Sequence, residues 1–265
     1  MMNMPIGSFL SHFREITLTT ADEKKYGIKV GPLAKLGFKI VGLPHIGLRM
    51  RVRFITRLAR KLPITSSILD AGCGYGVLSF ELAQRGFSIT SLDLDPDRIE
   101  QVNTMAQNFP HLTGKITAQV GSVLKTNYQS NQFDLSMCSE VIEHLSEDAK
   151  AVQELSRVTK SGGLIVISVP TDSLRNAKEF HLLGHKRPGY SKKMLQDLAL
   201  KNNMNLIKYI PYEFTIGRIA TRVHLSLKYP ALFALFFYPF YLISFLDFLI
   251  QIGEANASVA VFKKN

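Results

Sequence analysis

The feature that most constrains the fold is an acid followed by three glycines between two apolar segments. Residues 68–76 read Ile-Leu-Asp-Ala-Gly-Cys-Gly-Tyr-Gly, and helix-type spacing of apolar residues starts at Val77. The apolar members Ile64, Ile68 and Leu69 suit a central strand of a parallel sheet, so the glycines lie on a strand-to-helix turn. Glycine there permits positive φ and lets a ligand approach the backbone without meeting a Cβ atom. The pattern predicts a nucleotide-type cofactor site.

The glycine spacing disfavours a dinucleotide as that cofactor. The dehydrogenase fingerprint Gly-x-Gly-x-x-Gly, started at Gly72, needs a glycine where this chain has Val77. Asp70 also lies where a pyrophosphate would be repelled. We therefore expect a cofactor with a cationic end.

Asp-Ala-Gly-Cys-Gly-Tyr-Gly resembles the first motif of the class I S-adenosylmethionine-dependent methyltransferases. The resemblance continues in the family's order over about residues 63–212, with a last strand near Ser258–Lys263. It implies an α/β fold with a Rossmann-like, doubly wound, seven-stranded sheet, and an enzyme that binds S-adenosyl-L-methionine. The later strands are expected at residues 88–92, 116–120, 133–139, 164–169 and 205–212.

The resemblance also assigns a cofactor site. In the family, the acid after the second strand takes both ribose hydroxyls, and Asp93 lies at close to the roughly 20 residues expected from the turn. Asp95 competes for this role, but the proline behind it already explains it as a helix N-cap. Ser122 and Val123 fall where the family contacts adenine, although a carboxylate is commoner there than serine. The expected cofactor-binding residues are Asp70, Gly72, Cys73, Gly74, Gly76, Asp93, Leu94, Ser122, Val123 and Ser139.

A cluster of acids and histidines follows the fourth expected strand, where this fold places groups that face the methyl donor. Glu140, Glu143 and His144 stand at i, i+3 and i+4, so a helical turn would put them on one face. Glu-x-x-Glu-His resembles the metal cluster of small-RNA 2′-O-methyltransferases and of ubiquinone-pathway O-methyltransferases. There a divalent ion gathers hydroxyl oxygens and lowers their pKa. His181 or His185 would be a further ligand.

Other members of the family carry Glu-His at this point without a metal, and use the histidine as a base or as a hydrogen bonder in the pocket wall. We favour His144 as the base, Glu143 as the group that orients it, and His185 as a further catalytic side chain. A metal bound by Glu140, Glu143 and His144 is the alternative, with Mg²⁺ the expected ion. A histidine that only bonds to the backbone is the third interpretation.

Two segments outside the motifs bear on the substrate. Residues 171–190 follow the fifth expected strand, where the family covers its acceptor. Residues 214–254 form a hydrophobic insertion before the last strand, and their apolar run reaches the roughly 20 residues of a membrane span. A crossing would separate two strands of one sheet, so we expect an interfacial hairpin, a wall for a lipophilic acceptor, or a dimer contact. Pro239 is expected to divide the run into two short helices, and Asp247 would be costly in lipid.

The chain as a whole is expected to divide into an N-terminal helical lid, residues 1–62, and the methyltransferase domain, residues 63–265. The net charge is +11, and six of the basic residues lie between positions 47 and 61 on a basic amphipathic helix. That helix can pack on the sheet or meet an anionic membrane, and an arginine in it, Arg51 or Arg53, can reach the cofactor carboxylate from the lid. Only two cysteines are present and no signal peptide is evident, which favours the cytoplasm, either free or peripheral on the cytoplasmic membrane face.

Together these features predict methyl transfer to a lipophilic small molecule, such as a quinone, an isoprenoid or another natural product, with O-methylation favoured. Nucleic acid is not an expected partner, while a homodimer stays open. Two other functions also stay open. One is RNA 2′-O-methylation, suggested by the acid and histidine cluster and the positive charge, and the other is a non-catalytic membrane-associated scaffold of the same fold.

Overall fold

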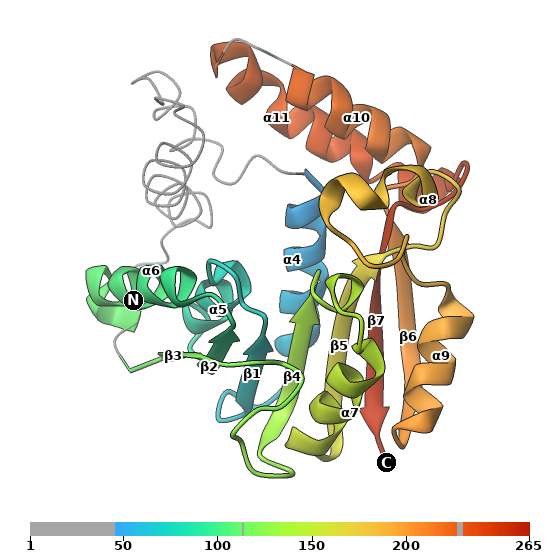
Figure 1. The fold of residues 1–265 in the computed structure, drawn as a ribbon. Helices are drawn as coiled ribbons and strands as arrows, with labels where there is room; N and C mark the ends of the chain where they lie inside the picture. Colours follow the sequence, from blue (N-terminus) through green and yellow to red (C-terminus); the bar gives the residue numbers. More distant parts are fainter. Residues whose placement is uncertain (1–45, 113, 227–229) are drawn as a thin grey trace. The chain divides into compact units, whose positions relative to one another are not determined.

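A computed structural model describes residues 46–112, 114–226 and 230–265 (Figure 1). The chain divides into two compact units, one made of Met1–Met50 and Tyr212–Glu254, the other of Arg51–Pro211 and Ala255–Asn265. We call the described residues of the first unit the helical unit, and those of the second unit the sheet unit. Most of the expected N-terminal lid, residues 1–45, lies outside the described residues.

The sheet unit contains a seven-stranded sheet in the order β3-β2-β1-β4-β5-β7-β6 (Figure 1). Strands β3, β2, β1, β4 and β5 pair in parallel, and β7 runs antiparallel to β5. This order confirms the fold class predicted from the motifs. The strands are β1 (Ser67–Ala71), β2 (Ser88–Asp93), β3 (Ile116–Val120), β4 (Phe133–Ser139), β5 (Thr159–Pro170), β6 (Met204–Tyr212) and β7 (Ala257–Lys264).

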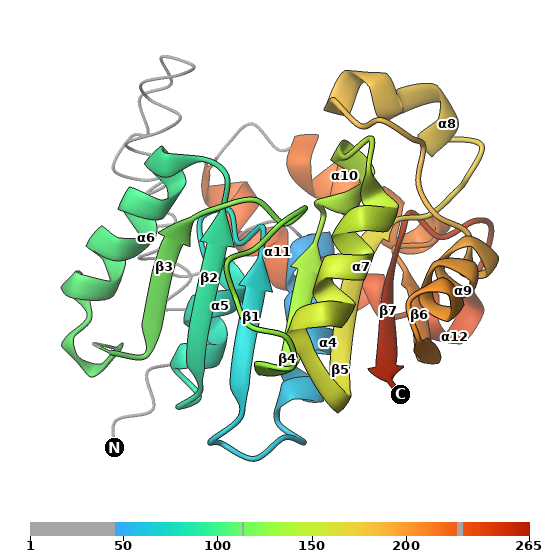
Figure 2. The same cartoon turned by 60° about the horizontal axis from the view of Figure 1, so that its bottom comes forward.

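Helices cover both faces of the sheet, with α5 behind it and α7 in front in Figure 2. The predicted helix start at Asp95 is confirmed, because its side chain accepts a hydrogen bond from the N–H of Asp97. The side chain of Ser191 likewise accepts one from the N–H of Met194. The helices are α4 (Ile46–Ala59), α5 (Val77–Ala83), α6 (Pro96–Asn108), η2 (Pro110–Leu112), η3 (Ile142–His144), α7 (Asp148–Val158), α8 (Asn176–Glu179), η4 (Phe180–Leu183) and α9 (Lys192–Lys201).

The central strands form the core because both of their faces are covered. Leu69 in β1, Leu135 in β4 and Ile165 in β5 are completely buried, as expected for strands of a parallel sheet. Ile64 does not belong to β1 as predicted, since the strand starts at Ser67, whose N–H donates to the carboxylate of Asp134. Ile64 precedes the strand and stays exposed.

The basic helix predicted at residues 47–61 is α4, which spans the boundary between the two units. In its sheet-unit part, Val52, Ile55 and Ala59 are buried, while Arg53 and Arg57 are exposed. The helix therefore packs its apolar face within the protein and presents arginines to solvent, as one of the two interpretations predicted.

The hydrophobic insertion folds as three helices of the helical unit: α10 (Thr215–Ser226), α11 (Pro230–Ser244) and α12 (Asp247–Ile250). The expected break at Pro239 is wrong, because α11 continues through this proline. The chain turns instead just before Asp247, whose carboxylate accepts the backbone N–H groups of Ile216 (3.1 Å) and Gly217 (2.7 Å) and so caps the start of α10. Among the described helices, none is long and apolar enough to cross a bilayer.

Candidate functional site

The glycine turn after β1 has the left-handed backbone that only glycine adopts easily. Gly72, Gly74 and Gly76 have φ of 76°, 55° and 75°. A Cβ atom on Gly72 would collide with a methyl group of Val141, so the turn packs closely against the segment after β4. A Cβ atom on Gly74 would meet nothing within 4 Å. A ligand can therefore approach the turn at Gly74.

Asp93 is held against this turn by the parallel pairing of β1 with β2, in which Ala71 lies opposite Leu92. Its carboxylate accepts the N–H of Gly74 at 2.7 Å and the N–H of Asp95 at 3.1 Å. The carbonyl oxygen of Leu92 accepts the N–H groups of Gly72 and Cys73. The structure thus brings the predicted ribose-binding acid to the open side of the glycine turn.

Asp70 is buried beneath the turn and has partners that the motif did not reveal. The hydroxyl of Ser79, on α5, donates to its carboxylate at 2.6 Å, and that hydroxyl lies 2.8 Å from the hydroxyl of Ser91 on β2. Burial, together with the charge of nearby Asp93 and against the lowering effect of the Ser79 hydrogen bond, raises the pKa of Asp70 to about 6. The signal for Ser79 was a serine inside the apolar run Val-Leu-Ser-Phe.

The other predicted cofactor residues surround the same edge of the sheet. The N–H of Gly121 donates to the carbonyl oxygen of Asp93, which places Ser122 beside the second strand. The hydroxyl of Ser122 accepts the N–H of Leu124 at 3.2 Å, Val123 is buried, and Leu94 is 72 % exposed. Ser139 ends β4. Cys73 is buried, and because burial raises its pKa the thiol stays protonated.

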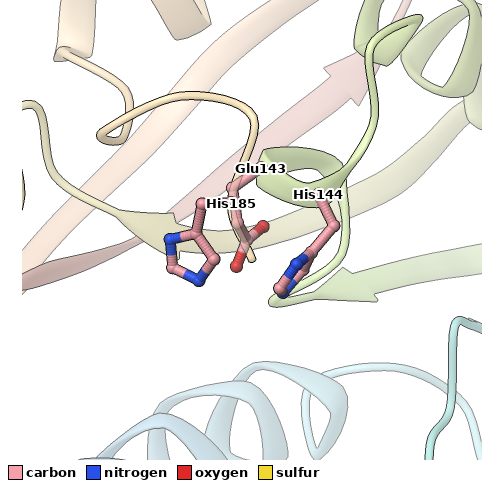
Figure 3. Close-up of side chains that lie close together, drawn as sticks. All are labelled: Glu143, His144 and His185. Atoms are coloured by element: carbon pink, nitrogen blue, oxygen red, sulfur yellow. The ribbon is translucent and has the colours of Figure 1, made fainter. Parts of the chain in front are cut away.

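Glu143, His144 and His185 point toward one another in Figure 3. One potential ligand atom from each lies within 4.8 Å of the others. Glu143 and His144 come from η3, and His185 comes from the loop after η4. Glu140 is absent from this group, so the prediction of one shared helical face is wrong, because η3 begins only at Ile142.

Glu140 instead has a left-handed backbone with φ of 56°. Its carboxylate lies 3.0 Å from the guanidinium of Arg51 and accepts a hydrogen bond from the hydroxyl of Ser168 at 3.1 Å. Arg51 also lowers the pKa of Asp70 and that of Glu143 through its charge. It therefore contributes a positive charge at the carboxyl ends of β1 and β4.

Glu143 is completely buried, and neither of its carboxyl oxygens has a hydrogen-bond partner. Burial, followed by the charge of Glu140, raises the pKa of Glu143 to about 9, so the carboxyl group is protonated at neutral pH. An unpartnered buried acid is costly unless a cation or a donor approaches it. The two carboxyl oxygens of Glu143 are therefore available to bind a cation or to accept hydrogen bonds.

The imidazole of His144 is oriented by a backbone carbonyl. Its Nδ1–H donates to the carbonyl oxygen of Gly184 at 3.3 Å, which leaves Nε2 with a free lone pair. Glu143, the predicted orienting group, makes no hydrogen bond to it. The ring of His185 lies 4.6 Å from that of His144, nearly perpendicular, and burial and the charge of His144 lower the pKa of His185. The lowered pKa favours the neutral form of the His185 imidazole, which can accept a proton or a hydrogen bond.

The predicted acceptor-covering segment is fixed beside this group. Thr171 bridges to Tyr190, and the Tyr190 hydroxyl donates to Asp148 at 2.8 Å. The N–H of Lys186 donates to the carbonyl oxygen of Glu143 at 2.7 Å. His181 is exposed, packs against a neighbouring aromatic ring, and lies outside the group, so of the two candidate histidines only His185 joins it.

Residues 69–167 match the family model described as a methyltransferase domain. The mitochondrial ubiquinone biosynthesis O-methyltransferase of Schizosaccharomyces pombe is 33 % identical over 134 residues, which is 50 % of this chain and 48 % of that protein. The ubiquinone biosynthesis O-methyltransferase of Colwellia psychrerythraea is 32 % identical over 111 residues, 41 % of this chain and 44 % of that protein. The chain thus spans about half the length of the curated relatives it matches.

Solved structures share the fold at lower identity. A geranyl diphosphate methyltransferase in complex with S-adenosylmethionine matches with a TM-score of 0.62 and 14 % identity, over 82 % of this chain and 85 % of that one. The [4+2]-cyclase SpnF matches with a TM-score of 0.57 and 16 % identity, over 80 % of this chain and 81 % of the cyclase. Because a cyclase and a methyltransferase both match, these structures establish the fold alone.

Proposed function

We propose that this chain, whose residues 69–167 match the family model described as a methyltransferase domain, is a class I S-adenosylmethionine-dependent methyltransferase that transfers a methyl group to a hydroxyl oxygen of a lipophilic small molecule. The observation that carries the proposal is the glycine turn, open at Gly74, with the carboxylate of Asp93 fixed beside it. Ubiquinone biosynthesis O-methyltransferases as relatives support the choice of oxygen as the methylated atom.

The residues around the turn fit S-adenosylmethionine. Asp93 would bind the ribose hydroxyls, and the space at Gly74 would admit the cofactor, which a side chain there would exclude. Arg51 forms an ion pair with Glu140, and its charge lowers the pKa of Asp70. Its positive charge would also attract the carboxylate group of the cofactor. Leu94, Ser122 and Val123 would face the adenine. When bound, this cofactor supplies a sulfonium methyl group for in-line displacement.

His144 would accept the proton that the acceptor hydroxyl releases as its oxygen attacks. Its Nε2 is the available nitrogen, because Nδ1–H is engaged by Gly184. The step depends mainly on proximity and orientation, to which general-base catalysis adds about 10² to 10⁴ in rate. The proton passes from the hydroxyl to His144, and the methyl group replaces it on the oxygen.

A divalent cation is a second way in which this cluster can lower the pKa of a hydroxyl. The ion would be held by Glu143, His144 and His185. The two carboxyl oxygens of buried Glu143, which lack hydrogen-bond partners, favour binding of a cation. Two imidazoles and one carboxylate suit Mn²⁺, Zn²⁺ or Fe²⁺ better than the oxygen-preferring Mg²⁺ expected from the sequence. A bound ion would act as a Lewis acid on the acceptor oxygen.

The acceptor class rests on the relatives and on the apolar insertion. The matched relatives act in ubiquinone biosynthesis, so a hydroxylated aromatic ring with an apolar tail is the proposed substrate class. A peripheral position at the cytoplasmic face of a membrane and a homodimer belong to the same proposal. RNA 2′-O-methylation and a non-catalytic scaffold stay as alternatives.

The test is a methyl-transfer assay with purified chain, labelled S-adenosylmethionine and three acceptors: a prenylated catechol, the same catechol without its tail, and short single-stranded RNA. We expect O-methylation of the prenylated catechol, with a higher KM for the tailless ring. Methylation of RNA alone would contradict the acceptor class. Cofactor binding without transfer to any of the three would leave the acceptor class unsupported and favour a search among N and C acceptors, whereas absent cofactor binding would favour the scaffold.

A further inference from the structure

The end of the hydrophobic insertion exposes large apolar side chains one after another. The exposed fraction reaches 82 % at Leu249. Such exposure on a folded protein marks a surface that meets a partner. We call these side chains, from the end of α11 to the loop after α12, the apolar tip; they are Leu242, Ile243, Leu246, Leu249, Ile250 and Ile252.

The apolar tip contains no charged side chain, and the exposed acid Glu254 follows it. Between residues 230 and 253 the single charged residue is Asp247, which is fully buried because its carboxylate caps α10. The other acid at the base of α10, Glu213, is also buried and accepts a hydrogen bond from the hydroxyl of Thr221. Both carboxylates are thus withdrawn from the surface by hydrogen bonds inside the helical unit.

Helix α10, which packs beside α11 (Figure 1), adds basic and apolar positions in parallel rows. Arg218 and Arg222 stand at i and i+4, and so do the exposed Ile219 and Val223. Arg49 at the start of α4 lies with its guanidinium 5.8 Å from the ring centre of Tyr238. Arginine and tyrosine beside exposed aliphatic side chains are typical of a helix surface that lies at a lipid–water interface.

We propose that the helical unit binds the surface of an anionic bilayer. The apolar tip enters the interface, and Arg218 and Arg222 meet lipid phosphates. The four-residue α12 is far too short to cross, so the contact is shallow, which agrees with the absence of a spanning helix among the described residues. A second copy of the chain is the less suitable occupant, because each copy carries a net charge of +11 and presents the same arginines.

This inference deepens the peripheral membrane position proposed above by naming the surface that makes the contact. It does not depend on the methyl-transfer chemistry, although a bilayer would concentrate a lipophilic acceptor. The test is flotation of the full-length chain with phosphatidylcholine vesicles, with and without phosphatidylglycerol. The tip variant is Leu249→Ser, Ile250→Ser and Ile252→Ser. The matched control replaces three similarly exposed apolar side chains of the sheet unit: Ile64→Ser, Leu200→Ser and Ile207→Ser.

We expect the wild type and the control to float with anionic vesicles, and the tip variant to lose at least about tenfold in membrane partitioning. Arg222→Ala should lose about fivefold on anionic vesicles and nothing on neutral ones. Unchanged binding of S-adenosylmethionine by the tip variant would show that it is folded and would keep this result separate from the proposed enzyme function.

Three outcomes would overturn the proposal. The first is a wild type that never floats with anionic vesicles, and the second is a tip variant that floats as well as the wild type. The third is a lipid-free dimer, seen by sedimentation, that the tip variant cannot form while vesicle binding is lacking throughout. That last result would assign the apolar tip to a subunit contact.

Discussion

The buried carboxyl group of Glu143 makes the stability of this protein depend on pH in a way that one substitution removes. Its pKa is raised from 4.5 to about 9 in the folded chain. Between these values the folded state keeps a proton that the unfolded state has released. The free energy of unfolding therefore falls as pH rises through this window, by about 1.4 kcal/mol per pH unit. Below pH 4.5 Glu143 is protonated in both states, so the free energy of unfolding no longer depends on pH through this group.

Glu143→Gln should remove this slope, because glutamine keeps the shape of the protonated acid and does not titrate. Between pH 5.5 and pH 7.5 the wild type should lose about 3 kcal/mol relative to the variant. For a chain of this size that is a difference of roughly 6 to 12 °C in the change of Tm, measured by thermal unfolding followed by circular dichroism. Glu147→Gln, which removes an exposed carboxylate from the next turn, is the control and should follow the wild type.

Parallel curves for the wild type and Glu143→Gln would show that Glu143 is ionised in the folded protein, against the raised pKa. The same experiment with added Mn²⁺ separates the two proposed roles of the cluster. A bound cation keeps Glu143 ionised, so the metal alternative predicts that Mn²⁺ flattens the wild-type slope. The base alternative predicts no change.

Three further substitutions test the turn, the base and the cap. Gly72→Ala should lower the free energy of unfolding in urea by about 2 to 4 kcal/mol through its left-handed φ and its collision, whereas Gly114→Ala, left-handed but in open space, should lose only about 1 to 2 kcal/mol. His144→Ala should reduce kcat by about 10² to 10⁴ without changing cofactor affinity in calorimetry, and full activity would exclude both roles of this histidine. Asp247→Ala should destabilise the chain in urea by about 1.5 to 3 kcal/mol through loss of the α10 cap, and an effect no larger than that of exposed Asp197→Ala would contradict that role.

The sequence predicted well those features that depend on local spacing. The doubly wound, seven-stranded sheet followed from the resemblance that the motif series carries, and Asp95 was identified as a cap from its proline neighbour alone. The gathering of His144 with His185 was predicted as one of two choices. The alternative, His181, lies in the same segment. Which histidine reaches His144 depends on the path of that segment, whose ends are joined by the bridge of Thr171 to Tyr190.

Features set by contacts far apart in the sequence could not be read from it. The prediction that Glu140 lies on a helical face assumed that the helical turn begins at Glu140 itself. In the structure Glu140 has a left-handed backbone, and its carboxylate contacts Arg51 and Ser168. Pro239 looked like a break, but where the chain turns is decided by the reach of Asp247 to the start of α10. The roles of Asp93 and of the other cofactor residues stay predictions.

Binding of S-adenosylmethionine by the glycine turn and Asp93 can be measured by calorimetric titration of the cofactor. Asp93→Ala removes charge-assisted hydrogen bonds worth roughly 1.5 to 3 kcal/mol each, so the Kd should rise by about tenfold or more. Asp95→Ala removes the neighbouring acid, which caps α6 and pairs with Arg98, and should leave the Kd nearly unchanged. Saturable binding by the wild type with this difference between the two variants is the predicted result. No binding by the wild type, or equal affinity in Asp93→Ala, would contradict the account.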